Sequence, residues 1–353
     1  DGELFDGFED KEQRYRKRYL DLIVNPDVKE TFVKRAKIYK SIRNFFDENQ
    51  YLEVETPILQ PLYGGASARP FKTHHNTLDM ELFLRIADEL YLKRLIIGGF
   101  EKVYEFSRNF RNEGMDRTHN PEFTAIEWYE AYVDYYFLMD QVEALFKHVS
   151  RDLDQHVFEF NDHEIDLNQP FHRATMAELV QQYAQVDLST ADEGELLKVC
   201  RANNIDAPTD SNYGQLLDAL FDELVQPHLI NPTFVTEYPK AISPLAKNKR
   251  ESDGTFVERF ELFIAGAEFA NAFTELNDPI DQRERLESQS ALRAAGDEEA
   301  QTLDEDFLQA MEYGMPPTGG VGMGLDRLVM LLTGNRSIRD VLLFPQMRPE
   351  SKG

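Results

Sequence analysis

Two glutamates fall on facing strands of a β-hairpin expected in the last third of the chain, where they could hold a metal ion. With Ala265-Gly266 as a two-residue turn, Phe263 pairs with Glu268, and Glu261 shares the face of Phe263. Glu261 and Glu268 are then diagonal cross-strand neighbours. Carboxylates this close repel each other unless a cation or a proton lies between them, and carboxylates with phosphate oxygens are usual ligands of Mg²⁺. The pair therefore indicates a magnesium site, with two solvated glutamates as the alternative.

A second expected hairpin, formed by residues 102–113 and 122–132, carries charged and aromatic side chains on one face. Strand alternation puts Arg111 and Glu113 together on the outgoing strand. The return strand places a mixed set on a common face: Phe123, Glu127 and Tyr129. Arginine grips phosphate bidentately and an aromatic ring stacks on a base, so this face suits a nucleotide. A solvated sheet surface with ordinary salt bridges is the alternative.

A glycine-rich stretch at 319–324 leads into an apolar helix expected over 325–332, and Arg327 falls in its first turn. Glycines let another group approach the backbone closely, and a cation is unfavourable at a helix N-terminus, so Arg327 is a candidate ligand-binding residue. The glycine spacing resembles a dinucleotide fingerprint, but only about thirty residues follow it, too few for a βαβ unit. No P-loop sequence is present.

Composition limits the class of protein. The chain has 353 residues, of which 42% are hydrophobic, enough for a core, and neither a transmembrane helix nor a signal peptide is expected. The single cysteine, Cys200, excludes an internal disulfide and a cysteine-based zinc site and indicates a reducing, cytoplasmic setting. The net charge of −26 argues against a general nucleic-acid-binding surface and is interpreted as adaptation to high salt.

The elements that must position these residues follow from hydrophobic periodicity. Apolar residues recur at helical spacing over 27–49, and a short strand-like run follows at 51–59. Polar, helix-rich stretches within about 171–230 predict an inserted helical subdomain. Long hairpins with helices around them, instead of alternating βαβ units, predict an α+β fold in which an antiparallel β-sheet is flanked by helices.

Three of these segments resemble the signature motifs of class II aminoacyl-tRNA synthetases. Residues 51–57 resemble motif 1, which builds the dimer interface in that family, residues 110–123 resemble motif 2, and residues 320–327 resemble motif 3. Further strings are similar to those of bacterial-type lysyl-tRNA synthetases: Gly64-Gly65-Ala66, Arg69-Pro-Phe71, Glu89-Leu-Tyr-Leu-Lys-Arg94 and Thr274-Glu-Leu-Asn-Asp278. The similarity covers nearly the whole chain. It implies an enzyme that activates L-lysine with ATP and transfers it to tRNA(Lys).

The resemblance assigns roles around the nucleotide. Arg111 would clamp the α-phosphate and the substrate carboxylate and stabilise the transition state, with Arg327 as the other catalytic residue. Phe123 and Arg327 would sandwich the adenine ring. Glu113 would meet the adenine amino group, and His119 would touch the polyphosphate. The two hairpin glutamates would hold Mg²⁺, in agreement with the register argued above.

The resemblance also assigns an amino-acid pocket. Glu275, with Tyr129 and Glu127, would take the side-chain ammonium of lysine, because a buried cation needs an uncompensated carboxylate. Other residues would bind the rest of the substrate. Gly65 and Glu89 would contact the α-amino group of lysine, and Asn271 would contact the backbone atoms of the substrate. No cation is expected at these positions. Asp88 stands where many members have proline and is not expected to touch the substrate.

Domain organisation follows from the same resemblance. Residues 1–26 would be a linker after an anticodon-reading OB-fold outside this chain, and residues 27–353 would be the catalytic domain. Such a chain is expected to form a homodimer through the motif 1 helix and strand, and to activate lysine but charge tRNA weakly. The alternatives are a paralogue that lysylates a translation elongation factor, an amide-forming ligase of the asparagine-synthetase kind, and a non-catalytic dimeric binding module. The linker disfavours the paralogue, and the carboxylate-rich pocket disfavours the amide-forming ligase. The intact motif residues disfavour the non-catalytic binding module.

Overall fold

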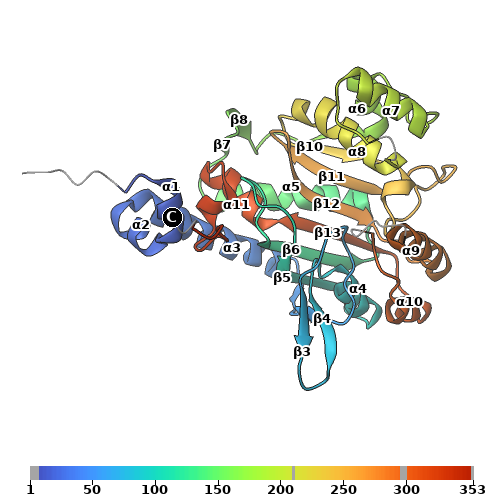
Figure 1. The fold of residues 1–353 in the computed structure, drawn as a ribbon, viewed down its shortest axis with the longest axis horizontal. Helices are drawn as coiled ribbons and strands as arrows, with labels where there is room; N and C mark the ends of the chain where they lie inside the picture. Colours follow the sequence, from blue (N-terminus) through green and yellow to red (C-terminus); the bar gives the residue numbers. More distant parts are fainter. Residues whose placement is uncertain (1–7, 209–210, 295–299, 351–353) are drawn as a thin grey trace, which may run out of the picture.

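The computed structural model describes residues 8–208, 211–294 and 300–350. Eight strands form the central sheet: β1 (Leu52–Glu53), β5 (Lys102–Phe110), β6 (Glu122–Ala131), β9 (His172–Thr175), β10 (Thr233–Thr236), β11 (Arg259–Ile264), β12 (Ala267–Thr274) and β13 (Thr318–Gly324). Their order in the sheet is β1-β5-β6-β13-β12-β11-β10-β9 (Figure 1). Both hairpins expected from the sequence are present, as β5–β6 and β11–β12.

The sheet is mixed. Its interior ladders are antiparallel, whereas each edge strand is parallel to its neighbour, β1 to β5 and β9 to β10. A local turn can close an antiparallel pair, but a parallel pair needs a long crossover that leaves no short-range signal in the sequence. The α+β class with helices flanking a sheet is therefore confirmed, and the expected antiparallel sheet is corrected to a mixed one with a parallel pair at each edge.

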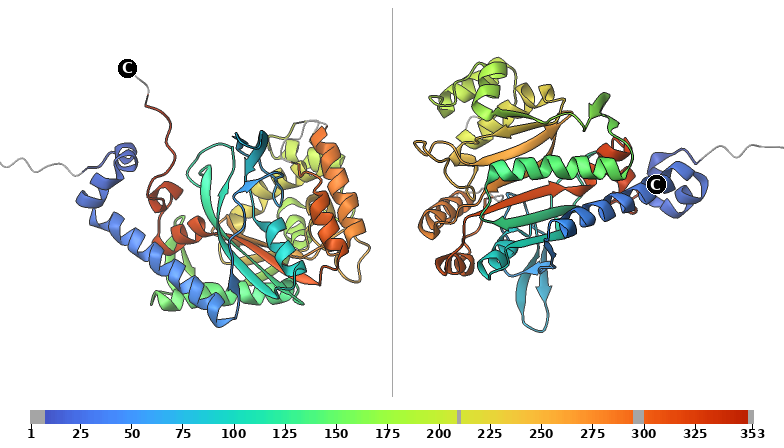
Figure 2. Two further views of the ribbon diagram at one scale, coloured as in Figure 1. Left: turned by 90° about the horizontal axis from the view of Figure 1, so that it is seen from below. Right: turned by 180° about the vertical axis from the view of Figure 1, so that it is seen from behind.

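Two long helices, α3 (Pro26–Glu48) and α5 (Tyr135–Asp152), lie across one face of the sheet (Figure 2). Aromatic rings make the contact. Phe46 of α3 stacks on Tyr104 of β5 with ring centroids 4.7 Å apart, and it lies 5.2 Å from the ring of Trp128 in β6. Because side chains alternate along a strand, the other face of the sheet is left for the functional residues.

Three helices pack at the β9–β10 edge: α6 (Met176–Ala184), α7 (Glu193–Ala202) and α8 (Tyr213–Leu224). They share a second apolar core with Val235 and Phe263 of the sheet, and Cys200 is buried in it. Helices therefore form where the sequence predicted them within 171–230. Strand β9 from the same stretch joins the central sheet, and the assignment of these residues as an insertion stays a prediction.

Smaller elements surround the sheet. Helices α4 (Glu89–Ile97), α9 (Pro279–Ala294) and α10 (Glu305–Glu312) lie together on one side (Figure 1). The others are β2 (Leu59–Gln60), β3 (Lys72–His75) and β4 (Met80–Leu84), the hairpin β7 (Val157–Phe160) and β8 (His163–Asp166), and helices α11 (Leu325–Thr333) and α12 (Ile338–Val341). Among the described residues, no helix is both long and apolar enough to cross a membrane.

The segment before α3 forms two further helices, α1 (Lys11–Arg16) and α2 (Arg18–Val24). Arg18 is buried, its Nη1 lies 2.5 Å from Asp21 Oδ2, and its guanidinium donates to three carbonyl oxygens near the chain's end, those of Arg339, Leu342 and Leu343. The described part of the expected linker is therefore docked on the rest of the protein. Residues 1–7 of that expected linker lie outside the described residues.

Candidate active site

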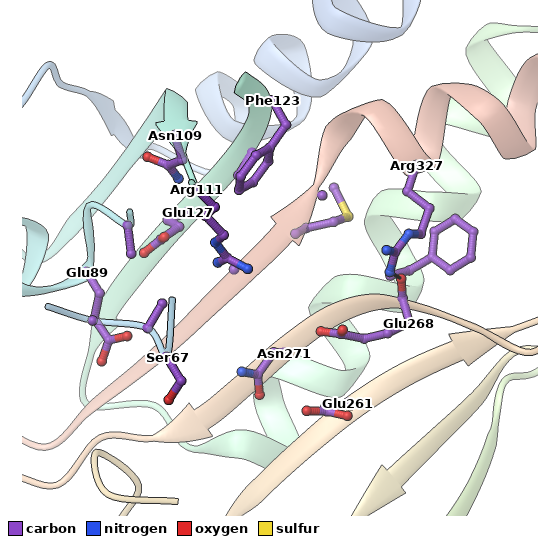
Figure 3. Close-up of a pocket in the computed structure, with 18 of the residues that line it drawn as sticks. Ser67, Glu89, Asn109, Arg111, Phe123, Glu127, Glu261, Glu268, Asn271 and Arg327 are labelled. Carbon is purple, nitrogen blue, oxygen red and sulfur yellow. Dashed lines mark hydrogen bonds between the residues drawn. The ribbon is translucent and has the colours of Figure 1, made fainter. Parts of the chain in front are cut away.

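A cavity of about 870 Å³ opens over the sheet face that α3 and α5 leave free, across strands β5, β6, β13, β12 and β11 (Figure 3). It brings together most of the residues assigned from the sequence: Gly65, Glu89, Arg111, Glu113, His119, Phe123, Glu127, Tyr129, Glu261, Glu268, Asn271 and Arg327. Glu275 alone among the assigned residues does not line it, and its Oε1 lies where a side chain on Gly320 would be. Residues spread over more than 260 positions of sequence, from Gly65 to Arg327, thus share one cavity.

One wall of the cavity carries Arg111 and Phe123, at the ends of β5 and β6. The guanidinium carbon of Arg111 lies 5.1 Å from the centroid of the Phe123 ring, within cation–π range. Arg111 Nε is buried and has no hydrogen-bond partner among the described residues. A buried donor without a partner carries a desolvation cost, so this guanidinium is suited to receive an anion in the cavity.

The loop between β5 and β6 carries Glu113 and His119, both exposed. The Glu113 carboxylate accepts a hydrogen bond from the backbone N–H of Arg69 at 3.3 Å. His119 Nδ1 lies 2.8 Å from a carboxylate oxygen of Asp116, which fixes the orientation of the imidazole ring. Both side chains are thus oriented by neighbours at the cavity rim, and their contacts with adenine and phosphate stay predictions.

Arg327 lies in the first turn of α11, as the sequence predicted, and its guanidinium donates to the backbone carbonyl of Glu268. Figure 3 shows Arg327 and Phe123 on opposite sides of the end of β13. The preceding residue, Asp326, has a structural role: its carboxylate forms an ion pair with Arg35 and accepts a hydrogen bond from the backbone N–H of Thr124, both at 2.7 Å. Asp326 therefore anchors the helix start, and Arg327 is left facing the cavity.

The second hairpin differs from its expected register in one respect. The turn and the pairing of Phe263 with Glu268 are confirmed. A β-bulge after Leu262 then shifts the strands, so that Glu261 pairs with Asn271. The extra β12 residue moves Glu268 away from the simple diagonal position. Both glutamates nevertheless line the cavity, so the bulge changes their spacing and not their common site.

Glu261 is held from two sides, by the hydroxyl of Tyr238 at 2.8 Å and the guanidinium of Arg259 at 2.5 Å. Burial raises the pKa of Glu261 to about 7, with Arg259 opposing and Glu268 adding to the rise. Among the described residues, no group of three or more His, Cys, Asp and Glu side chains is arranged to hold a metal ion. The two carboxylates therefore fit a hard cation such as Mg²⁺ only if phosphate oxygens complete its coordination.

Glu275 is fully buried, and the structure corrects the expectation that it is uncompensated. The ammonium of Lys93, also fully buried, lies between Glu275 Oε2 and Glu89 Oε1, at 2.5 Å from the latter. Glu275 Oε1 has no partner among the described residues. Burial raises the pKa of Glu275 to about 8, Lys93 opposes that rise, and Glu89 adds to it. A cation thus already shares the carboxylates assigned to lysine.

Carboxyl groups crowd around Glu127. The hydroxyl of Tyr129 donates to Glu127 Oε2 at 3.1 Å, and the buried carboxyl of Asp88 lies close enough to interact electrostatically with Glu127. Burial, then Asp88, then Glu89 raise the pKa of Glu127 well above its usual value. Asp88 is absent from the cavity lining, and the expectation that it does not touch a substrate stays a prediction. The site therefore favours a cation strongly.

Gly65 lies against Glu89 and has a backbone conformation that suits only glycine. Its φ is +85°, and a Cβ there would lie 3.0 Å from the Cβ of Glu89. Any side chain at position 65 would therefore be strained and would crowd the carboxylate. The glycine keeps this part of the cavity open beside Glu89.

Sequence reasoning missed two charged residues of the site. Arg259 lines the cavity and also donates to Asn271 Oδ1 at 3.0 Å, so it orients both an expected metal ligand and an expected substrate ligand. Strand alternation puts Arg259 on the same face as Glu261, a signal that could have found it. For Lys93 the i,i+4 spacing from Glu89 is the local signal, whereas its other partner, Glu275, is remote in sequence.

These features place the chain in a known family: it belongs to the class II tRNA synthetases. A family model described as "tRNA synthetases class II (D, K and N)" matches residues 10–348.

Several proteins named lysine–tRNA ligase are similar over nearly the whole chain. That of Porphyromonas gingivalis is 55% identical over 351 residues, which are 99% of this chain and 61% of that protein. That of Christiangramia forsetii is 53% identical, covering 100% of this chain and 62% of that protein. That of Moorella thermoacetica is 54% identical, covering 99% and 72%. The chain thus spans about three fifths of the length of the first two relatives.

Proposed function

We propose that the chain activates L-lysine with ATP, forming lysyl-adenylate and pyrophosphate. The observation that supports this best is the group of buried carboxyl side chains, Glu89, Glu127 and Glu275, at a cavity with Arg111 and Phe123 on one wall. A buried excess of carboxylates selects a cationic substrate side chain. The family and the relatives named lysine–tRNA ligase support the same reading.

The reaction needs positioning and charge stabilisation. A carboxylate oxygen of lysine attacks the α-phosphorus of ATP, and the bond from that phosphorus to the pyrophosphate oxygen breaks. Arg111 would hold the α-phosphate and the attacking carboxylate together and stabilise the charge that develops on the phosphoryl oxygens. No general base is required, because the attacking carboxylate is already ionised. Phe123 and Arg327 would hold adenine, with Glu113 at its amino group and His119 at the polyphosphate.

Glu261 and Glu268 would hold Mg²⁺ together with phosphate oxygens, and the bound ion would draw charge from the pyrophosphate leaving group. Tyr238 and Arg259 orient Glu261 for this role. At the other end of the substrate, Gly65 and Asn271 would meet the α-carbon end of lysine, with Glu89.

Transfer of the lysyl group to tRNA(Lys), a homodimer and a cytoplasmic location are also proposals. Large apolar side chains are exposed along the motif 1 strand and the residues after it, namely Leu52, Ile58, Leu59 and Leu62. A group of exposed apolar side chains is typical of an interface, which supports association through this region.

Product analysis tests the proposal. The chain is incubated with ATP, Mg²⁺ and labelled lysine, alone, with tRNA(Lys) or with a translation elongation factor, and AMP, lysyl-adenylate and labelled acceptor are quantified. We expect lysyl-adenylate in every reaction and label on tRNA at a low rate. Label on the elongation factor alone would favour the paralogue reading, and no adenylate from folded protein would contradict the proposal.

A further inference from the structure

We propose that Lys93 is a positioning residue of the amino-acid pocket: its ammonium fixes the carboxylates of Glu89 and Glu275 and turns one oxygen of Glu275 toward the cavity for the side-chain ammonium of the substrate. The inference deepens the proposed lysine activation and rests on it.

Lys93 holds the carboxylates of Glu89 and Glu275 rigidly in place. Lys93 and Glu89 are one turn apart on α4, so the helix itself sets their relative position. Glu275 comes from the end of β12, where its backbone N–H donates to the carbonyl of Thr318 at 2.8 Å. All three charged side chains are almost completely buried, with exposed fractions of 0%, 6% and 0% for Lys93, Glu89 and Glu275. Water therefore cannot replace the ammonium as the common partner of the two carboxylates.

Lys93 also sets which oxygen of the Glu275 carboxylate is left without a partner. Lys93 engages Oε2, and Oε1 is left without a partner among the described residues. That free oxygen lies against Gly320, which lines the cavity, and a Cβ built on Gly320 would overlap it and the ring of Tyr129. Because glycine has no side chain, Oε1 can lie at this position beside Tyr129, which faces the cavity from the paired residue of β6.

The charges of Lys93, Glu89 and Glu275 suit a single substrate ammonium. Burial alone would lower the pKa of Lys93, but Glu275 and Glu89 raise it above its usual value, so Lys93 stays an ammonium ion. Above the pKa values of both carboxyl groups, two carboxylates and one ammonium leave one negative charge, which one substrate ammonium can neutralise. The other ionisable groups that face this cluster are Glu127 and Tyr129 of β6, Asp88 before α4, and Arg259 of β11. Only Arg259 among them is cationic, and Glu261 pairs with it.

A role in stability alone makes a different prediction. A buried ion pair that only supports the fold would, when broken, lower the amount of active enzyme and leave the Michaelis constant of the remaining enzyme unchanged. A positioning role changes the Michaelis constant for lysine and spares that for ATP. The two readings therefore separate in kinetics normalised to active sites.

The test compares Lys93→Met with Lys147→Met by lysine-dependent ATP–pyrophosphate exchange. Lys147 is the matched control, since it makes the same i,i+4 pair with Glu143 at 2.6 Å on α5, outside the cavity. We expect Lys93→Met to raise KM for lysine at least thirtyfold, with KM for ATP changed less than threefold and Lys147→Met like the unmodified chain. Unchanged KM for lysine in folded Lys93→Met would overturn the inference.

The pH profile adds a readout that lost stability alone would not move. Below its pKa the Glu275 carboxyl is protonated and cannot bind an ammonium, so KM for lysine should fall as pH rises through that pKa. Lys93 lowers the pKa of Glu275, so the fall should occur at higher pH in Lys93→Met. An unshifted midpoint would count against the positioning role.

Two further measurements test the inference if Lys93→Met does not fold. Lys93→Arg keeps a cation with a different geometry, and it should fold with a KM for lysine raised at least fivefold. A crystal structure of the unmodified chain with lysine should place the substrate ammonium on Glu275 Oε1 while Lys93 keeps Oε2; displacement of Lys93 from Glu275 would overturn the inference. Absence of lysine-dependent exchange in the unmodified chain would instead contradict the proposed function itself.

Discussion

The guanidinium of Arg111 lies over the ring of Phe123, with its central carbon 5.1 Å from the ring centroid. The contact joins the residue proposed to bind the α-phosphate to the residue proposed to stack on adenine. A cation–π contact of this kind orients the guanidinium without using its N–H donors, which stay available for phosphate. One ring can thus support two steps of nucleotide binding.

Removing the ring should therefore affect both binding and catalysis. Phe123→Leu is expected to raise KM for ATP about tenfold, because base–aromatic stacking contributes roughly 1–3 kcal/mol, and to lower kcat as Arg111 loses its orientation. Phe137→Leu, at an exposed phenylalanine on α5, is the control. Pyrophosphate exchange at varied ATP measures both constants, and an unchanged KM for ATP in Phe123→Leu would contradict stacking on this ring.

The metal site should depend on pH. Burial raises the pKa of Glu261 to about 7, so this carboxyl is protonated below that pH and charged above it. A proton competes with a cation, and we expect the Mg²⁺ concentration for half-maximal exchange to rise as pH falls from 8 to 6. Glu261→Gln and Glu268→Gln should each raise it about tenfold or more, whereas Glu164→Gln on β8 should not. A flat pH profile would argue against Glu261 as a ligand.

Gly320 and Gly322 make a matched pair on β13. A Cβ on Gly320 would overlap Glu275 and Tyr129, whereas a Cβ on Gly322 would lie 3.7 Å from Glu127, an ordinary contact. Gly320→Ala should lower the free energy of unfolding by about 1–3 kcal/mol through overpacking, and Gly322→Ala by clearly less. Urea unfolding measures both. Equal stability of the two variants would show that Glu275 is not held against Gly320.

The N-terminal helices should contribute to global stability. Arg18 and Asp21 form a buried ion pair, and removing one partner of such a pair typically costs about 3–5 kcal/mol. Arg18→Met should therefore lower the free energy of unfolding by roughly that amount. The control is Arg283→Met, which breaks a more exposed pair with Glu305 and should change the free energy of unfolding far less. Similar melting curves for the two variants would contradict docking of α2.

Local pattern was sufficient to predict much of this site. The turn at Ala265-Gly266 determines that Phe263 and Glu268 are cross-strand partners. Side-chain alternation on β6 puts Phe123 and Glu127 on the face that lines the cavity. Turns and alternation are short-range signals, so they can be followed in a single sequence.

Other features depend on contacts that are distant in sequence. The Lys93–Glu275 pair joins α4 to the end of β12, and no periodicity links the two residues. The bulge after Leu262 depends on how β12 pairs on both of its sides, and the parallel edges β1 and β9 have no connecting turn. Helices α1, α2 and α5 were not predicted.

Amino-acid-dependent ATP–pyrophosphate exchange tests lysine activation by this chain directly. All standard amino acids are screened with Mg²⁺ at low and high salt, with the unmodified chain and with Glu275→Gln. We expect exchange with lysine alone, reduced at least a hundredfold in Glu275→Gln. Exchange with a different amino acid, or none from folded protein at any salt, would contradict this expectation.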